Sequence, residues 1–349
     1  MSFSDNSVIA KARAVYGQSL TVQDYGIMSA RTSVADVCAY LKQTQRYGRA
    51  LSAVNPQTVH RGQLEALLGK AVFDIFGRFH RFDFTAGRFY FRYIIMASEI
   101  DLLLTAVRDV SSSSSVDLIA SLPIFLAEHS CLDIEALGRA ESLGDIAEAI
   151  SGTVYYKPLR PLLCDSGGTA DASLPHRLFL CERTLYELYY TDLLRDIERS
   201  FSGGEKTELK RCVLKCADME NTVICCRMGR FFGADGSSVG EALVPFRYRL
   251  GEQAIERLVR LSDTEAIRAE LYGIGYGAGS RPCPETVEQL TDEISLDFLR
   301  RTLRLTKSSA VAYFALTECL KTELKSIRTV IEGVRYGVGG SEILSMIVV

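Results

Sequence analysis

A short helix signature returns along this sequence, marked by a polar start and a regular set of apolar positions. Each copy begins with a serine, has an acid three positions later and a tyrosine fourteen positions after the serine. The hydroxyl can accept a hydrogen bond from a free N–H of the first helical turn, where the acid also meets the positive end of the helix dipole. Each copy therefore predicts a helix start. The copies are Ser33, Asp36 and Tyr47; Ser142, Asp145 and Tyr156; and Ser262, Glu265 and Tyr276.

Apolar residues behind the serine follow the period of a helix with one buried face. Positions i, i+3, i+4 and i+7 lie on the same side of a helix. They are apolar in the first two copies: Val34, Val37, Cys38 and Leu41, then Leu143, Ile146, Ala147 and Ile150. The third copy departs from this pattern, because Asp263 and Glu270 occupy two of these positions.

A second repeated element lies 47 to 62 residues beyond each tyrosine and opens a longer amphipathic pattern. It starts with an acid followed two positions later by another charged residue: Glu99 and Asp101, Asp218 and Glu220, Glu323 and Lys325. Polar residues then recur at helical spacing: Arg108; Asn221, Arg227 and Arg230; Ser326, Arg328, Glu332 and Arg335. Charges three or four positions apart on a helix can pair. We therefore expect one long helix of this kind in each repeat.

These patterns favour an all-α fold. Alternating runs typical of strands are nearly absent, and the turn-forming pair Asp235-Gly236 has no alternating flanks. Helical periodicity also covers Leu64–Phe82, Glu182–Phe201, Lys206–Phe232, Glu252–Val259 and Glu285–Thr306. A chain of 349 residues exceeds the size at which one hydrophobic core usually stops growing. We therefore divide it into three related helical-bundle repeats: residues 1–115, 116–238 and 239–349.

Composition and charge narrow the class of function. Apolar residues make up 47% and charged residues 24%, which is typical of a globular protein. The 40 basic and 43 acidic side chains are interspersed, so no global field favours nucleic acid. No run of about 18 apolar residues occurs, which argues against direct membrane insertion. Ten cysteines without C-x-x-C spacing and a start without a signal-peptide pattern indicate buried thiols in a reducing cytoplasm.

No motif carries recognisable catalytic chemistry. The phosphate-binding loop of P-loop nucleotidases is missing, and the glycine run from Gly273 to Gly279 follows a predicted helix instead of a strand. The cysteines between Cys212 and Cys226 have the helical spacing of a packed apolar stripe, which favours core packing over a metal cluster. We therefore expect no enzymatic activity, no cofactor and no metal.

Arginines and aromatic residues alternate between Arg78 and Tyr93. Such a stretch can be a stacking surface for single-stranded nucleic acid. It can also be a helical hairpin with aromatic rings inside and arginines reaching outward. The absence of a basic charge excess favours the hairpin.

In the order of the two elements and in their triplication, the sequence resembles the C subunit of bacterial and archaeal V/A-type ATPases. The same family is called the d subunit in eukaryotes. The resemblance extends over essentially the whole chain. In the family's long-helix pattern an acid is followed by Asn and then by alternating leucines and basic residues. The second and third copies match it at Asp218, Asn221, Arg227 and Arg230, and at Glu323, Lys325, Arg328 and Arg335. The first copy departs, with Leu102 in the place of Asn and Leu104 in the place of a base.

The resemblance implies a funnel of three helical domains around a pseudo-threefold axis. It implies a non-catalytic central-stalk subunit, peripheral at the cytoplasmic face of the membrane, with the central-shaft subunits and the membrane rotor ring as partners. Such a socket would transmit torque during proton or sodium transport. Because they occupy equivalent places in the three copies, nine residues are expected to line or brace it: Glu99, Asp101, Arg108, Asp218, Asn221, Arg227, Glu323, Lys325 and Arg328.

Two other interpretations stay open. A helical-repeat scaffold for an unrelated protein partner would also be triplicated, although solenoid repeats usually span about 20 to 50 residues and the starting serines here are 109 and 120 residues apart. An enzyme with a site near Tyr276 would need a nucleophile beside a base, and no such pair can be named from the sequence.

Overall fold

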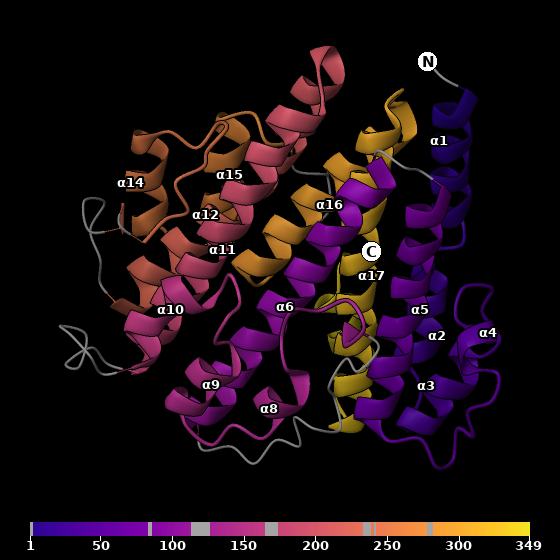
Figure 1. Ribbon diagram of the computed structural model, residues 1–349. Coiled ribbons are helices and arrows are strands. Elements are labelled where there is room, and N and C mark those ends of the chain that lie inside the picture. Colours follow the sequence, from indigo (N-terminus) through magenta and orange to yellow (C-terminus); the bar gives the residue numbers. More distant parts are fainter. Residues whose placement is uncertain are drawn as a thin grey trace. The chain divides into compact units, whose positions relative to one another are not determined.

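The computed structural model describes residues 3–82, 86–112, 126–164, 174–232, 239–240, 242–277 and 282–349. Within these ranges the regular secondary structure is helical and contains no β-strand (Figure 1). The all-α class predicted from the repeated helix starts is therefore confirmed. The predicted repeat boundaries, after Ser115 and after Ser238, lie outside the described residues.

Three pairs of long helices alternate with groups of short helices along the chain. The long pairs are α5 (Arg61–Phe82) and α6 (Ala86–Ser112), α11 (Leu174–Ser200) and α12 (Gly203–Phe232), and α16 (Val287–Leu305) and α17 (Ser309–Arg335). The short helices that precede them are α2 (Val22–Ser29), α3 (Val34–Leu41) and α4 (Gly48–Leu51); α8 (Ile134–Gly138), α9 (Leu143–Ala149) and α10 (Tyr156–Leu163); and α14 (Glu252–Arg260) and α15 (Thr264–Gly273). The remaining helices are α1 (Phe3–Tyr16) at the start and α18 (Gly340–Ser345) near the end. The five helices predicted from periodicity alone coincide with α5, α11, α12, α14 and α16, although the predicted ranges end one residue after α11 and extend one or two residues beyond each end of α16.

The second short helix of the first two repeats begins at the predicted serine. The Ser33 hydroxyl accepts a hydrogen bond from the Asp36 N–H at 3.1 Å, and the Ser142 hydroxyl accepts one from the Asp145 N–H at 3.1 Å. Serine is one of the preferred residues at this position because it satisfies an N–H that has no partner within the helix. The residues four and eight positions after each serine are buried: Val37 and Leu41, Ile146 and Ile150.

The corresponding helix of the third repeat starts one residue later than predicted. Its cap is Asp263, whose carboxylate accepts a hydrogen bond from the Ala266 N–H at 3.0 Å, and not Ser262. Aspartate caps a helix as well as serine does. With Asp263 as the cap, the residues four and eight positions later are Ile267 and Leu271, which are buried. A shift of one residue therefore restores two of the four apolar positions in this copy, while Thr264 and Arg268 occupy the other two.

The described chain forms two compact units. One contains Met1–Tyr90 and Ile197–Val349, and the other contains Phe91–Asp196. The boundaries fall within α6 and α11, so each of these helices contributes to both units.

Helix α17 is the centre of the first unit. It packs against α1, α2, α3, α5, α12, α16 and α18, and it lies beside α16 in Figure 1. Every residue from Ser309 to Thr317 is buried. A helix that is apolar on all sides is expected where neighbours cover it completely.

The stretch of arginines and aromatics forms part of this core. The Phe79 ring stacks on Tyr313 with centroids 4.9 Å apart, and Tyr90 meets Tyr313 edge-on at 5.5 Å. Phe79 and Tyr90 are buried, whereas Arg78 is exposed. Aromatic pairs of this geometry add about 0.5–1.5 kcal/mol beyond the area that they bury. Aromatic rings inside and arginine outside support the helical hairpin over the nucleic-acid surface.

In the second unit, α8 packs on α9 and α9 packs on α10. The Tyr93 hydroxyl on α6 donates a hydrogen bond to Asp196 on α11 at 2.6 Å, and Arg92 pairs with the same carboxylate at 3.1 Å. These contacts join the two long helices where both belong to this unit.

Across the part of the chain that the structure describes, no helix has the length and apolar character needed to cross a bilayer.

Candidate functional site: three buried acid–tyrosine clamps

The acids that open the repeated pattern of the long helices are buried. Glu99 on α6, Asp218 on α12 and Glu323 on α17 are 5%, 0% and 7% exposed. Removing a carboxylate from water is costly unless hydrogen bonds or a positive charge compensate it. Each of the three is surrounded by donors that provide this compensation.

Glu99 holds the short helices of the second repeat. One carboxylate oxygen accepts a hydrogen bond from the Tyr155 hydroxyl at 2.6 Å. The other accepts from the Ser130 hydroxyl at 2.6 Å and from the Cys131 N–H at 2.7 Å. Ser130 and Cys131 lie just before α8, and Tyr155 lies just before α10. One side chain thus fixes both ends of the segment that contains α8 and α9.

Asp218 holds the short helices of the third repeat. The Tyr276 hydroxyl donates to its carboxylate at 2.5 Å. Three consecutive backbone N–H groups also donate to it, from Tyr248 at 2.9 Å, Arg249 at 2.7 Å and Leu250 at 3.2 Å. These N–H groups lie just before α14, and Tyr276 follows α15. Asp218 therefore binds the same two positions of the repeat as Glu99 does: the backbone before the first short helix and the tyrosine after the second.

Glu323 holds the short helices of the first repeat. The Tyr47 hydroxyl donates to one carboxylate oxygen at 2.7 Å, and the Leu20 N–H donates to the other at 3.2 Å. Arg46 adds a positive charge, with its Nε 2.9 Å from the carboxylate and its side chain 1% exposed. The same guanidinium donates to the Ser19 hydroxyl at 2.9 Å. This clamp alone among the three includes a buried ion pair.

We call each arrangement an acid–tyrosine clamp: a carboxylate on a long helix, a tyrosine after the second short helix, and a backbone N–H before the first short helix. The pairs are Glu99 with Tyr155, Asp218 with Tyr276, and Glu323 with Tyr47. The long helix of the first repeat holds the short helices of the second, the second holds those of the third, and the third holds those of the first. The pairing is therefore cyclic, because the clamp of Glu323 with Tyr47 joins the last repeat to the first.

The clamp tyrosines stay protonated at neutral pH. Burial raises the pKa of Tyr47, Tyr155 and Tyr276 above the ordinary value, and the neighbouring carboxylate raises it further. A neutral phenol beside a buried carboxylate acts as a hydrogen-bond donor. Hydrogen bonds to an ionised acceptor are about twice as strong as those between neutral groups.

The tyrosine of the second repeat is Tyr155, not the predicted Tyr156. Tyr155 is completely buried, whereas Tyr156 is half-buried with Arg160 over its ring at 5.9 Å. The turn explains the shift. Thr153 lies two residues before its clamp tyrosine, whereas Thr44 in the first repeat lies three before its own, and each threonine accepts a hydrogen bond from that tyrosine's N–H. The spacing of fourteen residues from the serine therefore selected Tyr156, although the clamp tyrosine is the adjacent Tyr155.

Asn221, expected to line or brace a socket, is buried and binds backbone groups. Its amide accepts from the Val244 N–H at 2.9 Å and donates to the carbonyls of Val244 at 3.0 Å and Phe246 at 3.2 Å. It thus holds the segment that leads to the Asp218 clamp. Together with the three buried acids, it braces the structure and does not line an open surface.

The other predicted site residues lie nearer the surface. Arg227 on α12 is half-buried and pairs with Glu288 at 3.0 Å, and Lys325 on α17 pairs with Asp292. Both acids belong to α16, so these pairs connect long helices within the first unit. Four residues of the predicted set are exposed: Asp101, Arg108, Lys325 and Arg328.

Sequence patterns alone missed several clamp residues. Arg46 was missed because no basic residue precedes the clamp tyrosine in the other two repeats, where Val154 and Gly275 occupy that position. A leucine directly before the cap of the first short helix also recurs, and all three copies are buried: Leu20, Leu132 and Leu250. This leucine would have been found by aligning the caps of α2, α8 and α14.

Both oxygens of each clamp carboxylate accept hydrogen bonds from the protein itself. Such groups fix helices in place, and their surroundings differ from those of an acid poised to exchange protons with a substrate. Among the residues that the structure describes, no group of His, Cys, Asp and Glu is placed to hold a metal ion.

Comparison with known proteins agrees with this architecture. Residues 8–346 match the family described as ATP synthase (C/AC39) subunit. The chain is 24% identical over 339 residues to the A-type ATP synthase C subunit of Pyrococcus abyssi, a match that covers 93% of this chain and 85% of that protein. It is 26% identical over 155 residues to the A-type ATP synthase C subunit of Pyrococcus horikoshii, covering 44% of this chain and 39% of that one. The resemblance inferred from the repeated motifs is thus confirmed, and the chain belongs to the ATP synthase (C/AC39) subunit family.

Proposed function

We propose that this chain is the non-catalytic central-stalk subunit of a rotary V/A-type ATPase. In this role it forms a socket that links the central shaft to the membrane rotor ring and transmits torque during ion transport. Family membership supports a place in an ATPase complex. The two Pyrococcus relatives, both named as the C subunit of an A-type ATP synthase, support the same place.

The cyclic set of acid–tyrosine clamps carries the proposal. A part that transmits torque must deform little, so its helices need strong attachments to their neighbours. Buried hydrogen bonds to a carboxylate provide them, because breaking one leaves an unsatisfied charge in the interior. The cyclic order also supports three repeats, residues 1–115, 116–238 and 239–349, arranged as a funnel about a pseudo-threefold axis.

Eight of the nine predicted socket residues then divide into two roles, and the ninth, Arg227, braces α12 against α16 through its pair with Glu288. Glu99, Asp218, Asn221 and Glu323 brace the walls from inside, as their burial suggests. The exposed charges Asp101, Arg108, Lys325 and Arg328 are the members that would meet a partner. We place the subunit at the cytoplasmic face of the membrane, held there by the complex.

The direct test is purification of the tagged chain from gently solubilised membranes of its source cells. We expect the catalytic, shaft and ring subunits to copurify, together with ATP hydrolysis. Recovery of the chain alone, or with an unrelated partner and no ATPase subunits, would contradict the proposal and favour a helical-repeat scaffold.

Charge reversal tests the residues assigned to the partner surface. Lys325→Glu combined with Arg328→Glu should weaken capture of purified shaft subunits. Lys70→Glu is the control, because Lys70 is an exposed residue of α5 whose pair with Asp74 lies on the same helix. Shaft capture that is equal for the double variant and the control would remove these two residues from the proposed surface.

A further inference from the structure

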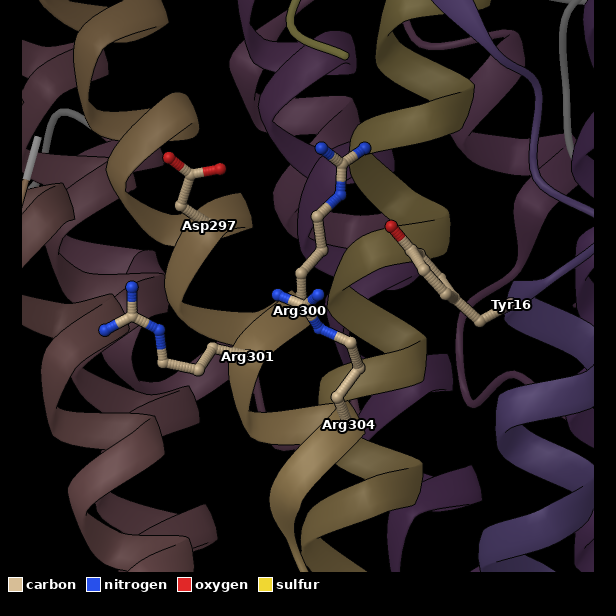
Figure 2. Close-up of a pocket in the computed structure, with 5 residues that line it drawn as sticks. All are labelled: Tyr16, Asp297, Arg300, Arg301 and Arg304. Carbon is tan, nitrogen blue, oxygen red and sulfur yellow. The ribbon is translucent and has the colours of Figure 1, made fainter. Parts of the chain in front are cut away.

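Four side chains on one face of α16 surround a hollow of about 420 Å³ in the first unit. Asp297, Arg300, Arg301 and Arg304 follow the spacing i, i+3, i+4 and i+7, which places them on the same side of the helix. Tyr16, the last residue of α1, completes the lining. Figure 2 shows the Tyr16 hydroxyl directed toward the guanidinium group of Arg300.

The hollow carries an excess of positive charge. Three guanidinium groups face one carboxylate, so its lining has a net charge of about +2 if each group is ionised. Within the described residues, none of these arginines forms an ion pair, and the Nε of Arg300 is buried without a hydrogen-bond partner. Like charges three or four positions apart on a helix destabilise it. Glu323 lies near Arg300 but is already paired with Arg46, so Asp297 offsets only part of the positive charge of the cluster.

A role in finishing α16 does not account for these arginines. Basic side chains near a helix end can donate to its last carbonyls. Here Arg13 of α1 already does so, with bonds to the carbonyls of Leu303 at 3.0 Å and Thr306 at 2.9 Å. Arg13 leaves Arg300, Arg301 and Arg304 available to the hollow and adds a further positive charge beside it.

Tyr16 adds a neutral donor. Burial raises the pKa of its hydroxyl above the ordinary value, although Arg300 acts in the opposite direction. The hydroxyl therefore remains protonated at neutral pH. Apart from the carboxylate of Asp297, the lining consists of guanidinium groups and one phenol, whose N–H and O–H donors suit an oxyanion.

We propose that this hollow is a binding site for a phosphate group. A phosphate monoester carries about −1.5 to −2 charges near pH 7, which matches the excess of the lining, whereas a single carboxylate would leave part of it uncompensated. The planar forks of arginine bind phosphate oxygens in pairs. The volume falls within the range of about 300–1,000 Å³ usual for small-molecule sites, so the group can belong to a free phosphorylated molecule or to a lipid headgroup.

Two measurements on the full chain separate these sources. Titration calorimetry with inorganic phosphate and pyrophosphate, at low salt, detects binding from solution. Flotation with phosphatidylcholine vesicles that contain phosphatidic acid, against vesicles without it, detects a lipid phosphate. The test variants are Arg301→Gln and Arg304→Gln, because both side chains are exposed and their loss should not disturb folding. Lys307→Gln is the matched control, since it removes one exposed charge nearby from outside the lining.

We expect saturable binding in at least one of the two measurements. Each arginine variant should weaken it about tenfold or more, the usual consequence of losing one charge-assisted contact. Lys307→Gln should change it less than about twofold, because Lys307 is exposed to solvent, where salt screens its charge, and makes no contact in the hollow. Binding in neither measurement would overturn the proposal. So would equal binding by the arginine variants and the control. None of these results bears on membership of the ATPase complex.

Discussion

Replacing Tyr155 by phenylalanine removes a single hydroxyl from the clamp on Glu99 and keeps the aromatic ring. That hydroxyl donates at 2.6 Å to a carboxylate oxygen for which the structure describes no other donor. Tyr156→Phe is the natural control, because it deletes the same atom from the adjacent tyrosine, which has its ring beside Arg160. The pair of variants compares the two adjacent residues directly.

The expected cost follows from the burial of both partners. Tyr155 and Glu99 are 0% and 5% exposed, so water cannot readily replace the lost hydroxyl. Hydrogen bonds to charged groups contribute about 1.5–3 kcal/mol to stability. We expect Tyr155→Phe to lower the free energy of unfolding of the second unit by about 2 kcal/mol. Tyr156→Phe should remain within about 0.5 kcal/mol of the unchanged protein, as most surface substitutions do.

Hydrogen–deuterium exchange of residues 134–163 provides the assay, because it reports on the segment that the clamp holds. A loss of about 2 kcal/mol corresponds to exchange roughly 30-fold faster in that segment. Urea unfolding followed by far-UV circular dichroism checks the global effect, since the chain has no tryptophan to serve as a fluorescent reporter. Equal acceleration of exchange by Tyr156→Phe and Tyr155→Phe, or no acceleration by either, would show that the Tyr155 hydroxyl does not hold this segment.

Three further substitutions test other parts of the structure. Glu323→Gln leaves Arg46 as an uncompensated buried charge and should cost about 3–5 kcal/mol in urea unfolding; an equal cost in an Arg46→Met background would show that the two do not interact. Gly229→Ala would force a methyl group into the backbone of α14 and should cost about 3 kcal/mol, whereas Gly204→Ala in the same helix meets open space and should stabilise by up to about 1 kcal/mol; similar melting temperatures for the two would contradict this packing. The hydroxyl that caps α9 lowers the pKa of Asp145, so the stability that this carboxylate contributes is present above its ordinary pKa and is lost as pH falls through the lower folded-state value. Asp145→Asn should accordingly lower the melting temperature at pH 7 and have little effect at pH 2, and an equal effect at both would exclude this source of pH dependence.

The helices themselves could be predicted from local patterns. A helix that starts at a serine cap and continues with apolar residues at helical spacing depends on residues within one or two turns of each other. Ser33 and Ser142 both cap helices as expected. Local patterns could not distinguish between two adjacent residues that are equally suitable for the same role. Ser262 and Asp263 are both good caps, and Tyr155 and Tyr156 have the same side chain, so only packing could decide between them.

The clamps could not be predicted because their partners are far apart in the sequence. Tyr155 lies 56 residues from its acid, Tyr276 lies 58 residues from its own, and Tyr47 lies 276 residues from Glu323. Charged residues on the long helices were expected to line or brace a socket, and their complete burial was not expected because most charges avoid the interior. The apolar residues that follow Glu99 were a signal that its helix is covered on several sides, and all four are buried: Ile100, Leu102, Leu103 and Leu104.

The most direct test of the connector role is coupling in membrane vesicles from the source cells. Vesicles depleted of this chain should lose ATP-driven ion uptake while the catalytic part still hydrolyses ATP, and addition of the purified chain should restore uptake. A socket between shaft and ring predicts this result, because torque cannot reach the ring without it. Ion uptake that persists at its full rate in depleted vesicles would contradict the account.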